Sequence, residues 1–103
     1  MSKPPELTGD VVVEKEMALK RADLLRGLPA ALGTDGFRVD GDAVILADGR
    51  KRFEIVMGDE RTRRIALLEV PAMTVRLRLA GYAPGEAKEA LARFDRAFQR
   101  GGG

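Results

Sequence analysis

The chain has 103 residues, 45% of them hydrophobic and 33% charged, and a formal net charge of +2 at pH 7. This length and composition are typical of one folded domain around a single core, and they exclude a fibrous or wholly disordered chain. The sequence contains neither Cys nor His, which excludes disulfides, thiolate nucleophiles, imidazole bases and the usual zinc and haem ligands. We therefore expect a protein that is not an enzyme and that holds no cofactor or metal ion.

Positive charge is concentrated in the second half of the chain. Residues 1–48 contain six Lys or Arg and nine Asp or Glu, whereas residues 49–103 contain twelve and seven. Arg supplies 13 of the 18 cations, and a GC-rich genome of bacterial type explains that choice as well as selection for anion binding does. The charge balance alone therefore indicates no particular partner.

Residues 1–10 are rich in Pro and polar residues. We expect them to form a flexible leader before a single domain of residues 11–100. No apolar run approaches the roughly 20 residues that a membrane-spanning helix needs, and the N-terminus has no hydrophobic secretory segment. The sequence therefore predicts a cytoplasmic protein that does not associate with a membrane.

The first predicted elements are a strand, a helix and two hairpins. Alternating residues over 11–17 favour a half-buried strand, and apolar residues with helical spacing over 20–32 favour a helix that ends at Gly33. Asp40-Gly41 and Asp48-Gly49 then predict two consecutive type I′ hairpins. With Asp48-Gly49 as the turn, Val44 pairs with Phe53.

The second hairpin assigns its side chains to two faces of the sheet, because successive residues of a strand point in opposite directions. One face, expected to pack on the helices, carries Val44, Leu46, Phe53, Ile55 and Met57. The other face carries Ile45, Arg52, Glu54 and Val56.

The last third of the chain predicts two further strands and a helix. Residues 61–70 favour one strand, and Pro71, which cannot donate to a ladder, is placed at the junction with the next strand. Over residues 73–79 apolar side chains alternate with Thr74, Arg76 and Arg78, so this strand has one apolar and one cationic face. Pro84 opens a final helix, which a glycine tail at residues 101–103 ends.

These elements predict an α+β fold. Short connections make neighbouring strands antiparallel, and two amphipathic helices need one apolar sheet face to cover. The expected architecture is a two-layer sandwich, with an antiparallel sheet of five or six strands and two helices on one face. The order of elements resembles the β-α-β4-α topology of the TATA-binding-protein-like group, a resemblance that concerns the fold and transfers no function.

The face of the sheet without helices is the predicted binding site. It combines Arg52, Arg76 and Arg78, which offer directional hydrogen bonds, with Ile45 and Val56, which exclude water. The sequence therefore predicts a small non-catalytic binding or adaptor module that contacts a protein partner, or a second copy as a homodimer, through this face. The alternative interpretation is a solvated face on which these arginines pair with acidic residues of adjacent strands.

Two further alternatives involve other ligands. A basic series within residues 50–78 can bind nucleic acid or another polyanion if its members converge on neighbouring strands and turns. It consists of Arg50, Lys51, Arg61, Arg63 and Arg64 together with Arg52, Arg76 and Arg78 of the predicted binding face. Few aromatic residues are available to stack on bases. The second alternative is a small molecule bound between the sheet and the helices, for which the sequence shows no cluster of polar residues.

Overall fold

The computed structural model describes residues 10–99 of the chain. In chain order, the described elements are β1 (Val11–Met17), α1 (Arg21–Leu32), β2 (Arg38–Asp40), β3 (Ala43–Asp48), β4 (Lys51–Met57), β5 (Arg61–Ile65), β6 (Leu68–Ala80) and α2 (Pro84–Gln99). Nearly all of the predicted leader and the whole predicted glycine tail lie outside the described residues.

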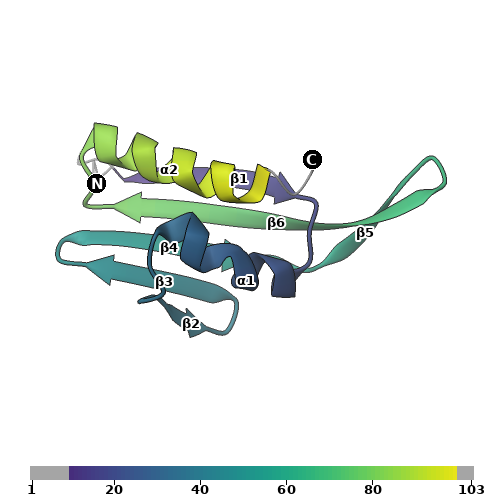
Figure 1. Ribbon diagram of the computed structural model, residues 1–103, viewed down its shortest axis with the longest axis horizontal. Coiled ribbons are helices and arrows are strands. Elements are labelled where there is room, and N and C mark those ends of the chain that lie inside the picture. The colour runs from purple at the N-terminus through teal and green to yellow at the C-terminus, as the bar shows by residue number, and fades with distance from the viewer. Residues whose placement is uncertain (1–9, 100–103) are drawn as a thin grey trace, which may run out of the picture.

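The sheet is antiparallel throughout. Its strands lie side by side in the order β1-β6-β4-β3-β2, and β5 pairs with β6. Both helices lie on the same face of this sheet (Figure 1), which confirms the predicted α+β two-layer sandwich. β4 and β5 both pair with β6, one after the other, and together occupy the place of a single strand. If the two are counted as one strand, the elements follow the predicted order of strand, helix, four strands and helix.

The core lies between the helices and the sheet and consists of apolar side chains. The helices contribute Leu24, Leu28, Ala31, Leu32, Ala87 and Phe94. The strands contribute Val44, Phe53, Ile55, Met57, Met73, Val75, Leu77 and Leu79. No polar or charged side chain of residues 10–99 is buried, so apolar burial holds the two layers together. The predicted helix-facing side of the hairpin is confirmed.

The two tight hairpins differ from the prediction in register. Gly41 and Gly49 have φ of 63° and 64° and stand at the first central position of each turn, so Asp48 pairs with Lys51. The second central residues lack positive φ, which fits a type II′ turn rather than type I′. Val44 therefore pairs with Ile55 and not with Phe53. Because the shift is an even number of residues, each side chain keeps its predicted face.

Residues 61–70 form most of a hairpin rather than the single strand that was predicted. β5 ends at Ile65, which pairs with Leu68 across a turn at Ala66 and Leu67. The sequence hides this turn because Ala66 takes a φ of 56°, a conformation that Gly, Asn or Asp usually supplies. We call residues 61–72 the arm, because the hairpin projects from one end of the sheet (Figure 1).

Pro71 lies inside β6, whereas the sequence analysis placed it at a junction between two strands. The Gly58 N–H donates to the Thr74 carbonyl at 2.8 Å, so even-numbered residues of β6 direct their backbone groups toward β4 and β5, and odd-numbered residues direct theirs toward β1. β1 ends before Pro71, at the pair Met17–Met73. No neighbouring strand therefore needs the N–H that proline lacks.

Candidate interaction surface

The sheet face opposite the helices, called the open face below, carries the five residues predicted as the binding site. Ile45 lies on β3, Arg52 and Val56 on β4, and Arg76 and Arg78 on β6. These three strands adjoin one another in the sheet, and Val56 pairs directly with Arg76. The structure therefore brings the predicted residues together on one surface.

Arg78 is the centre of an ion-pair network on the open face. Its guanidinium donates to Asp10 at 2.9 Å and lies 3.6 Å from Glu54, which also accepts a hydrogen bond from Arg52. The hydrogen bond to Asp10 and the nearby negative charges raise the pKa of Arg78 above its ordinary value. Arg78 is thus charged at any physiological pH and is oriented by carboxylates on both sides.

Ion pairing leaves the arginines of the open face with hydrogen-bonding capacity. A guanidinium has five N–H donors, whereas among the described residues Arg76 donates only to Glu14, at 3.2 Å, and Arg52 only to Glu54. The side chains of Arg52 and Arg76 are 50% and 61% exposed. Each arginine is therefore held in place by a carboxylate while it keeps donors for a partner's carboxylate or carbonyl oxygens.

The exposed aliphatic side chains of the open face are separated from one another. Val12 on β1 and Val56 on β4 are 57% and 43% exposed. β6 lies between these two strands, so the stems of its arginines separate the two valines. The open face is accordingly a mixed surface of charges and aliphatic groups rather than a continuous apolar patch.

The members of the basic series that lie outside the open face form two separate groups. Arg50 and Lys51 lie at the β3–β4 turn, whereas Arg61, Arg63 and Arg64 lie on β5, at the other end of the sheet (Figure 1). The full length of β4 separates the two groups.

The arginines of the arm are moreover paired with carboxylates of their own chain. Arg61 donates to Glu16 of β1, and Arg63 lies 3.6 Å from the same carboxylate. Arg64 donates to Glu69, its cross-strand partner, at 2.8 Å. These pairs reduce the positive field that the sequence alone suggested.

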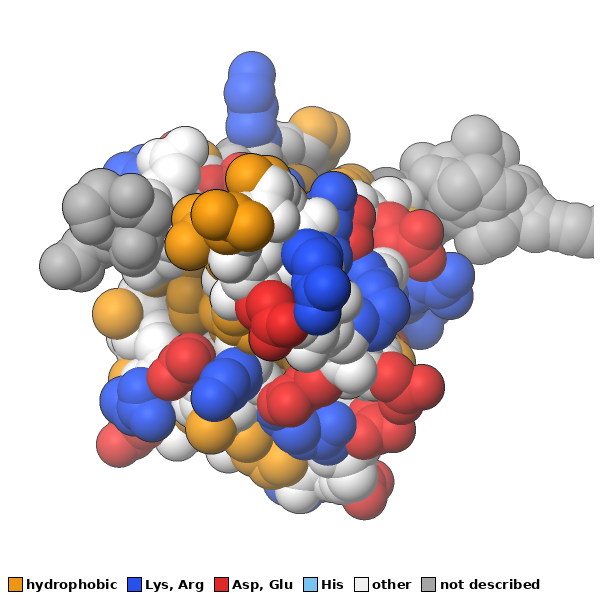
Figure 2. All heavy atoms as spheres, turned by 90° about the vertical axis from the view of Figure 1, so that its right-hand side faces the viewer, with side chains coloured by type: hydrophobic (Ala, Val, Ile, Leu, Met, Phe, Trp, Pro, Cys, Tyr) orange, Lys and Arg blue, Asp and Glu red, His pale blue; other side chains and the backbone are white. Residues whose placement is uncertain are grey.

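The tip of the arm carries an exposed apolar cluster that sequence analysis missed. Ile65, Leu67 and Leu68 are 52%, 99% and 65% exposed and lie together around the turn. Figure 2 views the molecule from the arm end, where apolar side chains stand among charged ones. The only signal in the sequence is the run Ile-Ala-Leu-Leu between charged residues, which reads equally well as part of a buried strand.

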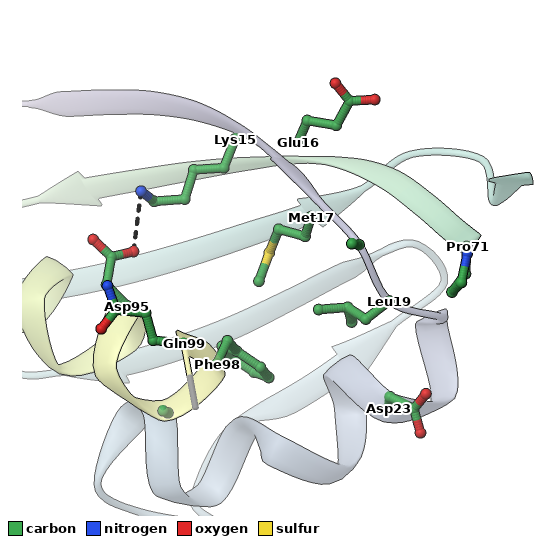
Figure 3. Close-up of a pocket in the computed structure, with 11 residues that line it drawn as sticks. Lys15, Glu16, Met17, Leu19, Asp23, Pro71, Asp95, Phe98 and Gln99 are labelled. Atoms are coloured by element: carbon green, nitrogen blue, oxygen red, sulfur yellow. Dashed lines mark ion pairs between the residues drawn. The ribbon is translucent and has the colours of Figure 1, made fainter. Parts of the chain in front are cut away.

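A groove of about 970 Å³, called the end groove below, lies at the base of the arm. Met17, Leu19 and Phe98 extend their side chains into it, and Pro71 of the arm lines one side (Figure 3). The groove is formed by the end of β1, the start of α1 and the end of α2. Sequence analysis did not reveal it, because these segments are far apart along the chain.

A second cleft, of about 570 Å³, lies between the two helices and the β3–β4 turn. Lys51 stands 5.4 Å from the centre of the Tyr82 ring and 3.4 Å from the Glu86 carboxylate. Burial raises the pKa of Tyr82, and a hydrogen bond from the backbone N–H of Ala83 lowers the pKa of Glu86, with a further contribution from Lys51. A polar cluster between sheet and helices therefore exists, although no pattern in the sequence indicated it.

Residues 10–99 contain no group of three or more His, Cys, Asp or Glu side chains placed to hold a metal ion. Over the same range, no helix is long and apolar enough to cross a membrane. The chain matches no known family, no curated protein and no solved structure. Its function has therefore to be inferred from its own surfaces.

Proposed function

We propose that the protein is a small non-catalytic binding module whose open face contacts a protein partner. The observation that supports this most directly is the convergence of oriented arginines with aliphatic groups on three adjoining strands. Arg52, Arg76 and Arg78 supply the directional hydrogen bonds, and Ile45 and Val56 supply apolar contact between them.

The partner that this surface fits is a protein segment rich in oxygen acceptors. Three guanidinium groups on adjacent strands can each meet a carboxylate or a backbone carbonyl, and a carboxylate can be held by two parallel N–H donors. The intramolecular carboxylates orient the guanidinium groups before binding, which lowers the entropy lost when the complex forms.

Capture from a cell extract with matched variants tests this proposal. The variant Arg76→Gln/Arg78→Gln removes two charges from the open face, and Lys88→Gln/Arg96→Gln removes two charges from α2 on the other side of the sheet. A partner of the open face should be retained from nuclease-treated extract by the wild type and by the α2 variant, and should be lost with the open-face variant. Circular dichroism verifies that all three proteins are folded.

Two outcomes would contradict the proposal. One is that all three immobilised proteins retain the same set of extract proteins, or that none retains a protein. The open face is then only a solvated surface on which arginines pair with carboxylates. If material is retained only before nuclease treatment, and its retention falls steeply with salt, polyanion binding gains support instead.

Ligand binding in the cleft beside Tyr82 is a second candidate function, which the convergence of Lys51, Tyr82 and Glu86 supports. The chain has one Tyr and no Trp, so its intrinsic fluorescence reports on this cleft alone. A small-molecule ligand should change the tyrosine emission in a saturable manner, and Lys51→Met should weaken that response. A library of small polar and aromatic compounds that leaves the emission unchanged would count against this function.

A further inference from the structure

The outer edge of β1 is a row of backbone groups without strand partners. Odd-numbered residues of β6 direct their N–H and C=O groups toward β1 and pair with the odd-numbered residues of β1. Val12, Glu14 and Glu16 therefore direct their backbone groups away from the sheet, of which β1 is the terminal strand. No backbone group of residues 10–99 pairs with those of Val12, Glu14 and Glu16. These N–H and C=O groups are available to a further strand.

The other free edges of the sheet carry features that hinder strand addition. β2, the opposite terminal strand, spans only three residues. The outer edge of β5 carries arginines, and the opposite edge of the arm carries Pro71. β1, by contrast, pairs with β6 over seven consecutive residues without a proline or a bulge. A regular free edge of this length is a template for an extended strand, which binds it through backbone hydrogen bonds.

The charged side chains of β1 are neutralised within the chain and do not select the occupant of this edge. They form the ion pairs Glu14–Arg76, Lys15–Asp95 and Glu16–Arg61. The strand begins with three valines, of which Val12 is 57% exposed. Binding at the edge therefore depends on backbone groups and on valine contacts.

A second copy of the chain brings the strand that this edge can bind. Addition to a sheet edge requires a partner strand whose own edge is free, and β1 of every copy meets that requirement. Antiparallel pairing of the two β1 strands about a two-fold axis covers both free edges in one contact. The joined sheet then ends on either side in β2, which is too short to recruit further copies. The geometry therefore closes at two chains.

The residue pattern of β1 favours one register of this pairing. Residues with outward backbone groups must lie opposite each other to form hydrogen bonds. A two-fold axis at Val13 meets this condition, because it sets Val12 opposite Glu14 of the second copy. The two Val13 residues then form a non-hydrogen-bonded pair, in which side chains lie closest, and no like charges of β1 are directly opposed. An axis at Glu14 would set the two Glu14 carboxylates against each other.

We propose that two copies join their sheets through β1, in antiparallel pairing about a two-fold axis at Val13. The axis is perpendicular to the sheet, so the helices of both copies lie on one side of a continuous sheet and the open faces on the other. Ile45, Arg52 and Val56 lie on β3 and β4, away from this contact. The dimer is therefore independent of the proposed function, and either can fail without the other.

Sedimentation velocity over a range of concentrations tests the dimer. The wild type should pass from monomer to dimer as concentration rises. Glu14→Pro removes an outward N–H from each copy and should weaken dimerisation about tenfold or more. Glu14→Gln retains that N–H, and it should dimerise as the wild type does.

Thr62→Pro is the matched proline control. Thr62 pairs with Pro71, an odd-numbered residue of β6, so its N–H faces away from β6 on the outer edge of β5. Proline is compatible with the fold at edge positions of this kind, and circular dichroism verifies that each variant is folded. Thr62→Pro should dimerise as the wild type does.

Hydrogen exchange of the unaltered chain locates the contact without any substitution. The amides of Val12 and Glu14 should exchange rapidly in dilute samples and at least about tenfold more slowly in concentrated ones. The amides of Val13 and Lys15 bond to β6 and should be protected at both concentrations. In a mixture of ¹³C-labelled and unlabelled chains, an intermolecular NOE should connect the two Val13 side chains.

A wild type that is monomeric at all concentrations would overturn the proposal. A folded Glu14→Pro variant that dimerises normally would also overturn it, as would a dimer that leaves the Val12 and Glu14 amides unprotected. If these amides of a monomer become protected only in cell extract, the edge binds an extended segment of another protein, and a second copy is excluded as its occupant.

Discussion

At Gly81, immediately after β6, the chain passes against the backbone of the β3–β4 turn. Gly81 has a φ of 80°, and a Cβ at this position would lie 2.1 Å from the carbonyl oxygen of Arg50. The position therefore requires glycine for two reasons, a left-handed backbone and a close approach between main chains. This contact aligns the start of α2 with the cleft around Tyr82.

Replacement of Gly81 by Ala should lower the free energy of unfolding by about 2 kcal/mol or more, because backbone strain adds to a main-chain clash. Gly85→Ala is the matched control, since a Cβ there meets nothing within 4 Å and alanine favours the helix by up to about 1 kcal/mol. Urea unfolding followed by circular dichroism compares the two variants. Equal stabilities would show that the chain can relax at Gly81.

Glu86, at the start of α2, makes a pH-dependent contribution to the stability of the fold. Its carboxylate accepts a hydrogen bond from the Ala83 N–H at 3.1 Å and pairs with Lys51, so its pKa in the folded protein lies below the ordinary 4.5. A lowered pKa stabilises the fold above pH 4.5, and this contribution is lost as the pH falls through the lowered value. The stability difference between wild type and Glu86→Gln should therefore be present at pH 7 and shrink in acid. A difference that is constant down to pH about 3 would contradict this assignment.

Among the secondary-structure elements, α2 packs its two aromatic side chains, Phe94 and Phe98, between α1 and the sheet. Phe94 is fully buried, and its ring centre lies 4.9 Å from that of Phe98 and 6.3 Å from that of Phe53. Offset and tilted aromatic contacts of this kind add to the free energy of apolar burial. Phe94 is therefore the one large side chain of α2 that is fully buried between this helix and the sheet.

The variant Phe94→Ala should lower the free energy of unfolding by about 3–5 kcal/mol, because it removes buried surface and leaves a cavity. Val39→Ala, at a half-exposed site on β2, should cost less than about 1 kcal/mol. Thermal and urea unfolding measure both changes. A small effect at Phe94 would mean that the helices repack around the cavity.

The sequence predicted the elements and their faces better than their pairing. Periodicity placed Phe53 and Ile55 toward the core and Arg76 toward solvent, because alternation depends only on neighbouring residues. The register at Gly49 was wrong, since Asp-Gly fits two kinds of turn that differ by one position. The turn at Ala66 was missed because alanine there takes a conformation that its type rarely adopts.

For the candidate site too, the sequence predicted which face a residue lies on but not which residues it contacts. Arg76 and Arg78 could be placed on the open face, because they alternate with buried residues of one strand. The sequence analysis offered ion pairs between adjacent strands as one interpretation of this face, but the individual partners Glu14 and Asp10 lie more than sixty residues away, so no local pattern identifies them. The end groove depends on three segments that meet only in the folded chain.

For the whole molecule, the arm and the body should behave as regions of different stability. β5 packs chiefly on β6, and all its residues are exposed, whereas the central strands pair on both sides and contact the helices. Opening of the arm exposes little apolar surface, so its free energy should be far smaller than that of global unfolding.

Hydrogen exchange tests this division. Amides of β5 should exchange rapidly and at the same rate in wild type and in Phe94→Ala, because local opening controls them. Amides of Ile55 and Leu77 should exchange slowly in the wild type and much faster in Phe94→Ala, because they require global unfolding. If β5 accelerates in step with Leu77, the arm unfolds together with the body.

Pro71 bears on whether the exposed edge of the arm can recruit further strands. The arm is a β-hairpin with an aliphatic tip and an outer edge that extends beyond β1, a combination that favours cross-β growth by addition of further strands. Pro71 directs its nitrogen to that edge and offers no N–H to an incoming strand. Pro71→Val should therefore shorten the lag before thioflavin T fluorescence rises in concentrated samples, while the melting temperature changes little. Through this missing donor, the β6 edge of the exposed hairpin is a poor template for an incoming strand.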